Sequence, residues 1–339
     1  MRRIVRSEAI CLRVKDYHES SKLVTLFTLE HGKVNCIAKG ARRLKSKFGA
    51  ALDLFARARV IYYWNETRTL YTLSDAELIH ASSGLSEPPE RFLAAEQMAE
   101  FALKALQPSD PSPQLYRLLL NYLSILESLQ VAVCSLQSPD SDTLHSAAGI
   151  NRQERQDSNQ DSLQSSSLAP SPQPLAPNPY SALVCSFLLK AASFLGFRPE
   201  LRRCLICRRP PEKDRAVFFD SARGGIVCAR CSGEQPSASR SAQSSIVSRQ
   251  SPIPVVRLDP ASLDILSFLL YTPATEIASL DSAILHSALC TLNSPSFLPS
   301  SLPTPSSLLS PLDLVLDFLS HHFDPLVLNS FRWRAGFPV

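Results

Sequence analysis

The 339-residue chain lacks the apolar segments that direct proteins into or across membranes. Its N-terminus begins Met-Arg-Arg, and Arg13 and Lys15 add charge before any apolar stretch reaches the length of a signal-peptide core. The longest apolar stretch, Ser181–Phe197, contains Lys190 and is too short to span a bilayer. These absences predict a soluble, cytoplasmic protein with no membrane partner.

Motifs that signal catalysis are also missing. The chain has no G-x₄-G-K-[ST] phosphate loop, no G-x-G-x-x-G, no G-x-S-x-G nucleophile turn and no H-E-x-x-H. Its seven histidines, including the adjacent His321 and His322, have no spacing typical of a metal or catalytic site. We therefore predict that the protein is not an enzyme.

Glycine is scarce and proline abundant, at 10 against 26 residues, and serine and proline are concentrated in three segments. Residues 137–179 contain no aromatic side chain, and residues 234–254 and 293–311 have a similar composition. Such segments bury too little apolar surface to offset the entropy lost on ordering. Residues 137–179 are therefore predicted to be a disordered insertion, and residues 234–254 and 293–311 are predicted to be flexible insertions.

The charge is distributed unevenly. Residues 1–80 hold 15 basic and 8 acidic side chains, whereas the remaining 259 hold 20 and 23. The excess of positive charge at the N-terminal end indicates an anionic partner for that part of the chain.

The N-terminal part reads as strands. Apolar and polar residues alternate around Ile10–Val14 and Val34–Ala38, and further β-rich runs occupy Leu23–Leu29, Phe55–Tyr63 and Thr69–Ile79. Five short strands within residues 1–82 suit a small closed barrel, which leaves no sheet edge unpaired.

Helical spacing follows in residues 86–136 and 180–339. Ser86-Glu87-Pro88 starts one helix, and a second is predicted from Gln114 to about Leu136. Further helices are predicted at Tyr180–Leu195, Ser262–Leu270, Thr275–Leu292 and Pro311–Phe323. The predicted fold is therefore α+β, a five-stranded barrel followed by an α-helical domain.

Four of the nine cysteines form two C-x₂-C pairs, Cys204/Cys207 and Cys228/Cys231. Twenty residues separate the pairs and contain a predicted hairpin, Val217–Phe219 with Ile226–Val227. This spacing is typical of tetrahedral zinc sites, and four protein ligands leave no position for a catalytic water. We predict a structural zinc element over residues 201–233. Its eight surrounding basic residues contact phosphate or form a solvated rim, and the sequence favours neither.

A basic segment, Lys39–Gly49, holds five cations in nine residues without an acidic one. The cations are Lys39, Arg42, Arg43, Lys45 and Lys47. So many cations in one predicted loop, within the domain that carries the excess positive charge, indicate that this loop binds nucleic acid. The nearby Phe48, Tyr62, Tyr63 and Trp64 are base-stacking candidates, but the pattern favours a place in the core for them.

Together, the barrel pattern, Lys39–Gly49, the segment Asp16–Leu23 and the four cysteines resemble the bacterial DNA repair protein RecO family. The resemblance implies an oligonucleotide-binding (OB) fold, a helical domain with the zinc element, and a recombination mediator of the RecF pathway associated with the nucleoid. It implies binding of single- and double-stranded DNA, annealing of complementary strands and, with RecR, loading of RecA onto strands covered by single-strand-binding protein. The family's DNA-contacting loop falls on the five cations, and its zinc ligands on the four cysteines.

Two other functions fit the barrel and the cations. One is an RNA-binding accessory factor of translation or transcription. The other is a zinc-braced protein-interaction scaffold whose basic loop binds an acidic peptide. Charge alone does not separate DNA from RNA, because both are polyanions.

Overall fold

The computed structural model describes residues 3–129, 179–212, 215, 217–232, 255–258, 260–279, 311–323 and 328. The three Ser/Pro-rich segments lie outside these ranges, except that the first and the third end at Pro179 and Pro311, which begin helices α3 and α7.

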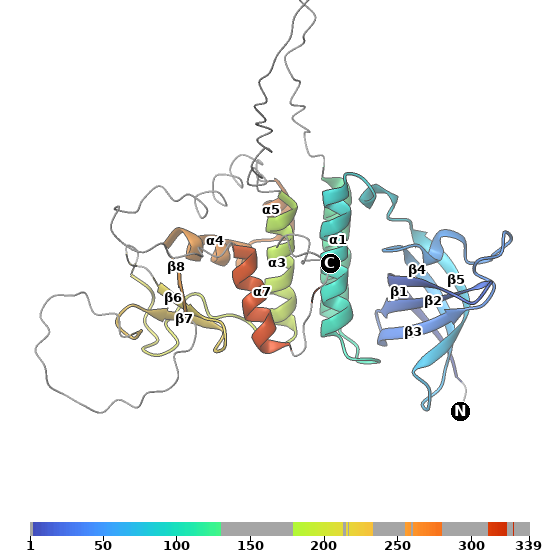
Figure 1. The fold of residues 1–339 in the computed structure, drawn as a ribbon, viewed down its shortest axis with the longest axis horizontal. Coiled ribbons are helices and arrows are strands. Elements are labelled where there is room, and N and C mark those ends of the chain that lie inside the picture. Colours follow the sequence, from blue (N-terminus) through green and yellow to red (C-terminus); the bar gives the residue numbers. More distant parts are fainter. Residues whose placement is uncertain are drawn as a thin grey trace, which may run out of the picture. The chain divides into compact units, whose positions relative to one another are not determined.

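The N-terminal strands close into a barrel (Figure 1). The strands are β1 (Arg3–Tyr17), β2 (Ser21–Thr28), β3 (Gly32–Ala38), β4 (Arg57–Trp64) and β5 (Leu70–His80), with a short 3₁₀ helix η1 (Gly49–Leu52) between β3 and β4. Their order around the barrel is β1-β2-β3-β5-β4, and β3 pairs with β5 in parallel. This closed five-stranded arrangement is an OB fold, as the resemblance implies.

Strand β1 departs from the alternation of buried and exposed side chains that was expected around Ile10, because consecutive residues are buried there. The pairing of β1 with β2 shifts between Cys11 and Arg13, and this bulge changes which residues point inward. Ala9 and Cys11 belong to the barrel interior, whereas Ile10 is buried outside that cluster. Side chains on both faces of β1 are therefore buried at this point, whereas an alternating pattern predicts that one face is exposed.

Helices follow the barrel. They are α1 (Pro89–Ala105), α2 (Pro113–Ser128), α3 (Pro179–Phe194), α4 (Pro260–Tyr271), α5 (Ala274–Ser279) and α7 (Pro311–His322), with a 3₁₀ turn η2 (Ser83–Leu85) before α1. Helices α1 and α3 lie side by side (Figure 1). The predicted helix Thr275–Leu292 is seen as α5, and its part beyond Ser279 lies outside the described residues.

Helix α2 ends earlier than the predicted Leu136. Leu129 has extended backbone angles, φ −67° and ψ 107°, so the prediction is wrong there. The Leu129 carbonyl accepts a hydrogen bond from the Arg91 guanidinium of α1, and Ser128 Oγ donates to the Ile125 carbonyl. The Arg91 side chain thus supplies a partner for the last carbonyl at the helix end, whereas the Ile125 carbonyl also accepts the Leu129 N–H at 3.1 Å.

Lys190, which interrupts the apolar pattern of α3, joins three helices from a half-buried position. Its Nζ donates to Tyr122 Oη of α2 at 3.1 Å and to the Thr272 carbonyl after α4. Burial lowers the pKa of the Lys190 ammonium to about 8. The ammonium group thus contributes to the packing of the helices through these two hydrogen bonds.

A second sheet has the order β7-β6-β8. Its strands are β6 (Val217–Asp220), β7 (Gly225–Cys228) and β8 (Val255–Leu258). The β6–β7 hairpin confirms the strand pair expected between the cysteine pairs. The sequence analysis missed β8, which pairs with β6 across a long stretch of chain.

Gly32, at the start of β3, packs against the connection between α1 and α2. Its φ is +64°, and an added Cβ would lie 1.9 Å from the Asp110 carbonyl oxygen. We expect Gly32→Ala to lower the free energy of unfolding by on the order of 1–3 kcal/mol, because it combines a left-handed backbone with a backbone clash. Gly49→Ala is the control, since Gly49 also has positive φ but has no atom within 4 Å of an added Cβ. Urea unfolding measures both; equal losses would contradict the close approach.

Glu8 of β1 is held by two groups. Arg57 Nε lies 2.7 Å and Tyr116 Oη of α2 2.8 Å from Glu8 Oε1. The hydrogen bond from Arg57 is the main cause that lowers the pKa of Glu8; partial burial opposes it, and the Tyr116 hydroxyl adds to it. Because the folded-state pKa lies below the unfolded one, the stabilisation is present above the unfolded pKa and is lost as pH falls through the folded pKa.

We therefore expect Glu8→Gln to cost about 1 kcal/mol at pH 7 and to flatten the loss of stability that wild type shows below about pH 4.5. Urea unfolding at a series of pH values measures this. Glu77→Gln is the matched control, because its ion pair with Arg59 is exposed and contributes little. An unchanged pH profile in Glu8→Gln would show that the carboxylate does not stabilise the fold.

Candidate nucleic-acid interface and metal centre

The predicted basic loop connects β3 to η1 and forms successive turns. Gly40 has φ +75°, the Arg43 N–H donates to the Gly40 carbonyl at 3.1 Å, and the Ser46 N–H donates to the Arg43 carbonyl at 2.9 Å. All five predicted cations are exposed. The fold therefore presents them to solvent, as a contact with phosphates requires.

Arg42 has a role different from that of its neighbours, because it ties the basic loop to the β1–β2 turn. Its backbone N–H donates to the Ser20 carbonyl at 3.0 Å, and Nη1 donates to the His18 carbonyl at 3.1 Å. Its Nη2 lies 3.5 Å from Asp16 Oδ2. These contacts position the loop against the turn, while the guanidinium of Arg42 stays exposed.

Lys47 fixes the other end of the loop. Its Nζ donates to the Ser74 carbonyl of β5 and lies 5.4 Å from the centroid of the Phe48 ring. Lys39, Arg43 and Lys45 have no carboxylate within 4.0 Å in the part of the chain that the structure describes. These three therefore lack the acidic partner that Arg42 has.

The aromatic candidates near the loop are largely core residues, as the sequence pattern favoured. Phe48 and Tyr62 are 3% and 0% exposed and belong to the barrel interior, and Tyr63 and Trp64 are half-buried. The exposed aromatic residues beside the loop are instead Tyr17 and His18, at the β1–β2 turn. The sequence analysis missed them, because they lie more than twenty residues before the basic segment in the chain.

The four predicted metal ligands come together. The sulfur atoms of Cys204, Cys207, Cys228 and Cys231 all lie within 4.8 Å of one another, and those of Cys207 and Cys228 are 3.8 Å apart. A tetrahedral zinc with Zn–S bonds of about 2.3 Å places its sulfurs about 3.8 Å apart. The spacing therefore fits four thiolates around one metal ion.

Backbone turns create this geometry. The Cys204 N–H donates to the Arg209 carbonyl, and the Arg208 N–H returns to the Cys204 carbonyl, both at 2.9 Å. Arg208 has φ 61°, so the first knuckle closes with a left-handed residue. In the second knuckle the Cys231 N–H donates to the Cys228 carbonyl at 2.9 Å. The β6–β7 hairpin then holds the knuckles against each other.

The surroundings of Cys204 favour a thiolate. Burial opposes its ionisation, but backbone N–H groups of Cys228, Cys207 and Ile206 outweigh that penalty and lower the pKa of the Cys204 thiol to about 6. By contrast, burial raises the pKa of Cys11 and of Cys36 to about 12, and these two behave as apolar core residues. Cys185 is also buried, and Cys134 and Cys290 lie outside the described residues.

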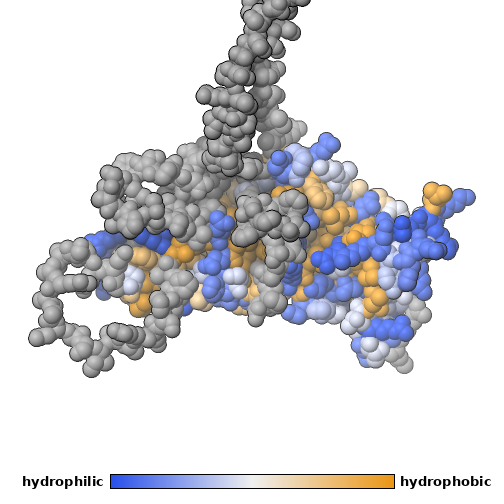
Figure 2. Space-filling view, viewed as in Figure 1, coloured by the Kyte–Doolittle hydropathy of each residue, from blue (hydrophilic) through white to orange (hydrophobic). Residues whose placement is uncertain are grey.

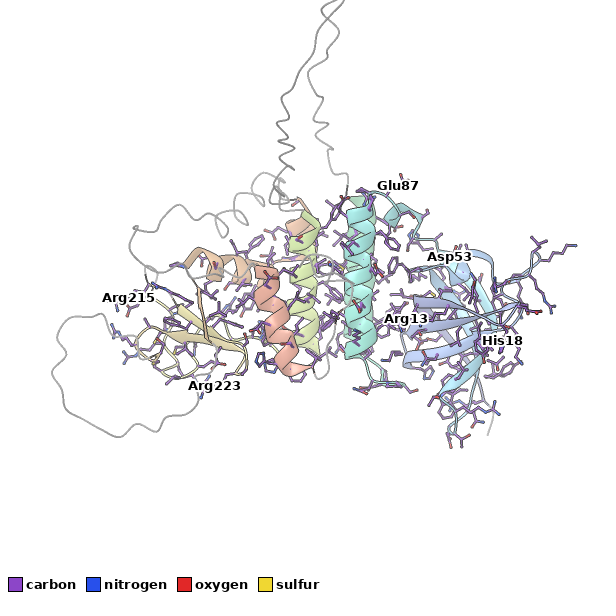
Figure 3. The ribbon with its side chains drawn as sticks, in the orientation of Figure 1. Arg13, His18, Asp53, Glu87, Arg215 and Arg223 are labelled. Carbon is purple, nitrogen blue, oxygen red and sulfur yellow. The ribbon has the colours of Figure 1, made fainter. Side chains whose placement is uncertain are left out.

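Several arginines around the cysteines have partners within the chain. Arg215 and Arg230 both pair with Glu212, Arg223 pairs with Asp220, and Arg202 stacks 3.9 Å from the centroid of Tyr271. Figure 3 shows Arg215 and Arg223 on the element that carries β6 and β7. These contacts favour a structural rim for the four arginines. Of the described cations of this element, the side chains of Arg203, Arg208 and Arg209 have neither an acidic nor an aromatic partner; Lys213 lies outside the described residues.

Comparison with known proteins agrees with this architecture. The family described as Recombination protein O N terminal matches residues 1–82, and that described as Recombination protein O C terminal matches residues 175–246. The chain belongs to the RecO family. The two matches cover the barrel and the segment with α3 and the metal element.

Similar proteins carry the same family name. The DNA repair protein RecO of Salinibacter ruber is 38% identical over 135 residues, which is 40% of this chain and 52% of that protein. Those of a Thermoanaerobacter species and of Desulfitobacterium hafniense are 27% and 26% identical, over 68% and 70% of this chain and 71% and 68% of theirs. The chain thus spans about half of the first relative and roughly 70% of the other two.

Within the described ranges of this RecO-family chain, no helix combines the length and the apolar character that crossing a bilayer requires.

Proposed function

We propose that this RecO-family chain is a non-enzymatic mediator of DNA repair and recombination that binds single- and double-stranded DNA and anneals complementary strands. Family membership supports the role in repair and recombination. The observation that carries the DNA-binding step is the exposed basic loop on an OB barrel, which is tethered at both ends while Lys39, Arg43 and Lys45 keep no acidic partner among the described residues.

The physical basis of annealing is charge neutralisation. Two complementary strands repel each other through their phosphates, and a basic surface that contacts backbones reduces this repulsion while the base edges stay free to pair. The interface described above consists of lysine and arginine side chains, whose contacts with phosphates carry no sequence information. The mechanism therefore needs no catalytic group.

The four cysteines are proposed to hold one structural zinc ion. Four thiolate ligands would leave such an ion no open position for a water or a substrate, so it would serve to join the two knuckles. The remaining partners proposed for the chain are RecR, single-strand-binding protein and, through loading, RecA, at the nucleoid of the cytoplasm.

A strand-annealing assay tests the function. Two complementary oligonucleotides, one carrying a fluorophore and the other a quencher, are mixed with the full chain at two salt concentrations, with and without single-strand-binding protein. We expect annealing faster than the spontaneous rate, slowed by salt and maintained on covered strands. Spontaneous rates throughout, or acceleration of RNA strands alone, would contradict the proposal.

A further inference from the structure

An exposed pair of aromatic rings lies beside the basic loop. We propose that Tyr17 and His18 are a stacking platform for the bases of a single nucleic-acid strand whose phosphates lie on the basic loop. The inference rests on the proposed function and assigns it a base-contacting surface.

The two rings are held together while remaining accessible. Their centroids are 4.1 Å apart with an interplanar angle of 68°, an edge-to-face arrangement. Tyr17 is 36% exposed and His18 is also exposed. In this geometry only one ring face is turned toward the partner ring, which leaves other faces free for a base. Figure 3 shows His18 at the end of the barrel where β1 meets β2.

The rings are fixed next to the cations. Arg42, inside the basic loop, donates to the His18 carbonyl and pairs with Asp16, the residue before Tyr17. His18 has φ 53°, a left-handed conformation that histidine adopts more readily than most residues with a side chain. The tether from Arg42 holds this conformation, so the rings and the loop form one surface.

The distribution of charge on that surface separates phosphates from bases. The turn and the loop together, residues 15–22 and 39–49, hold seven cations against two carboxylates. Both carboxylates, Asp16 and Glu19, lie on the turn. Lys15 and Lys22 balance these two carboxylates, so the turn has no net charge, whereas the loop has five cations and no carboxylate. A phosphate backbone is therefore attracted to the loop rather than to the turn, which favours uncharged bases over the rings.

Other aromatic side chains of this region are less suitable. Phe48 and Tyr62 lie inside the barrel, so a base cannot reach them. Figure 2 shows hydrophilic residues interspersed with hydrophobic ones over the visible face of the barrel strands. Exposed aromatic rings next to a cationic groove are the usual means by which OB barrels hold single strands without reading sequence.

The test compares two fluorescent probes of equal length with the full chain, oligo(dT) and an abasic oligodeoxynucleotide that has phosphates but no bases. We expect wild type to bind oligo(dT) at least about 5-fold more tightly, the effect of one stacked base. Tyr17→Ala and His18→Gly should remove this preference and leave the affinity for the abasic probe unchanged. His18→Gly is used because glycine keeps the positive φ without strain.

Two controls sharpen the assignment. Tyr17→Phe keeps the ring and should keep the preference, whereas Phe194→Ala removes an exposed ring from α3 and should change nothing. If Tyr17→Ala retains the full preference, the platform is overturned while DNA binding stands. If wild type binds neither probe, the proposed function itself fails.

Discussion

Chelation of the metal, or Cys204→Ser, is expected to lower the free energy of unfolding of the full chain by on the order of 5 kcal/mol. The element around β6 and β7 is small, and its knuckles are held by the sulfur cluster and few apolar residues. Its hairpin also packs on α7, where the rings of Phe219 and Phe318 lie 6.1 Å apart and His322 Nε2 lies 3.1 Å from the Ser221 carbonyl oxygen. The loss of metal should therefore loosen α7 as well.

Metal content by mass spectrometry and denaturant unfolding, each with and without chelator, measure this effect. We expect one zinc per chain in wild type and none in Cys204→Ser. A comparison with Cys207→Ser separates ligation from packing, because Cys204 is 1% exposed whereas Cys207 is exposed. Similar losses in both variants indicate ligation, and a loss confined to Cys204→Ser indicates packing.

A buried cysteine outside the cluster provides the control for this experiment. Cys36→Ala leaves a small cavity in the barrel and should cost stability without changing the response to chelator. Identical unfolding curves of wild type with and without chelator would show that no metal stabilises the element.

The sequence predicted correctly those elements whose own residues show a characteristic pattern. Each barrel strand has its own alternation, and the hairpin between the cysteine pairs is bounded by Asp220 and Gly225, which lie opposite each other in the pairing. The strand β8 has no comparable local signal, because its partner β6 lies far away in the sequence. The bulge in β1 could not be predicted from the sequence either, since it arises from the pairing of β1 with β2.

The same distinction applies to the candidate site. The residue types and the spacing of Cys204–Cys207 and Cys228–Cys231 predicted the cluster that the structure brings together. The sequence did not separate Arg42 from Arg43, because they are adjacent and chemically alike. Only the folded chain shows Arg42 bonded to the β1–β2 turn. The role of Tyr17 and His18 depends on that contact and therefore could not be predicted from residue spacing.

Replacement of Lys39, Arg43 and Lys45 together by glutamine is expected to weaken single-strand binding about 100-fold at 0.1 M salt. Each phosphate contact contributes about 0.7 to the slope of log affinity against log salt concentration for single strands, so three lost contacts reduce a slope of about −3 to about −1. The side chains of these three residues are exposed and have no acidic partner among the described residues, so the barrel should stay folded. Arg42 is left in place because it positions the loop.

Fluorescence anisotropy of labelled oligo(dT) over a series of salt concentrations measures the slope, and thermal unfolding checks the fold. The matched control is the triple variant Arg203→Gln, Arg208→Gln, Arg209→Gln, which removes the same charge from exposed positions of the metal element. A loss of affinity confined to the loop variant would locate the contact on the barrel. Equal losses in both variants would mean that the strand follows a surface shared by the barrel and the metal element, and an unchanged slope in the loop variant would exclude the loop as the phosphate contact.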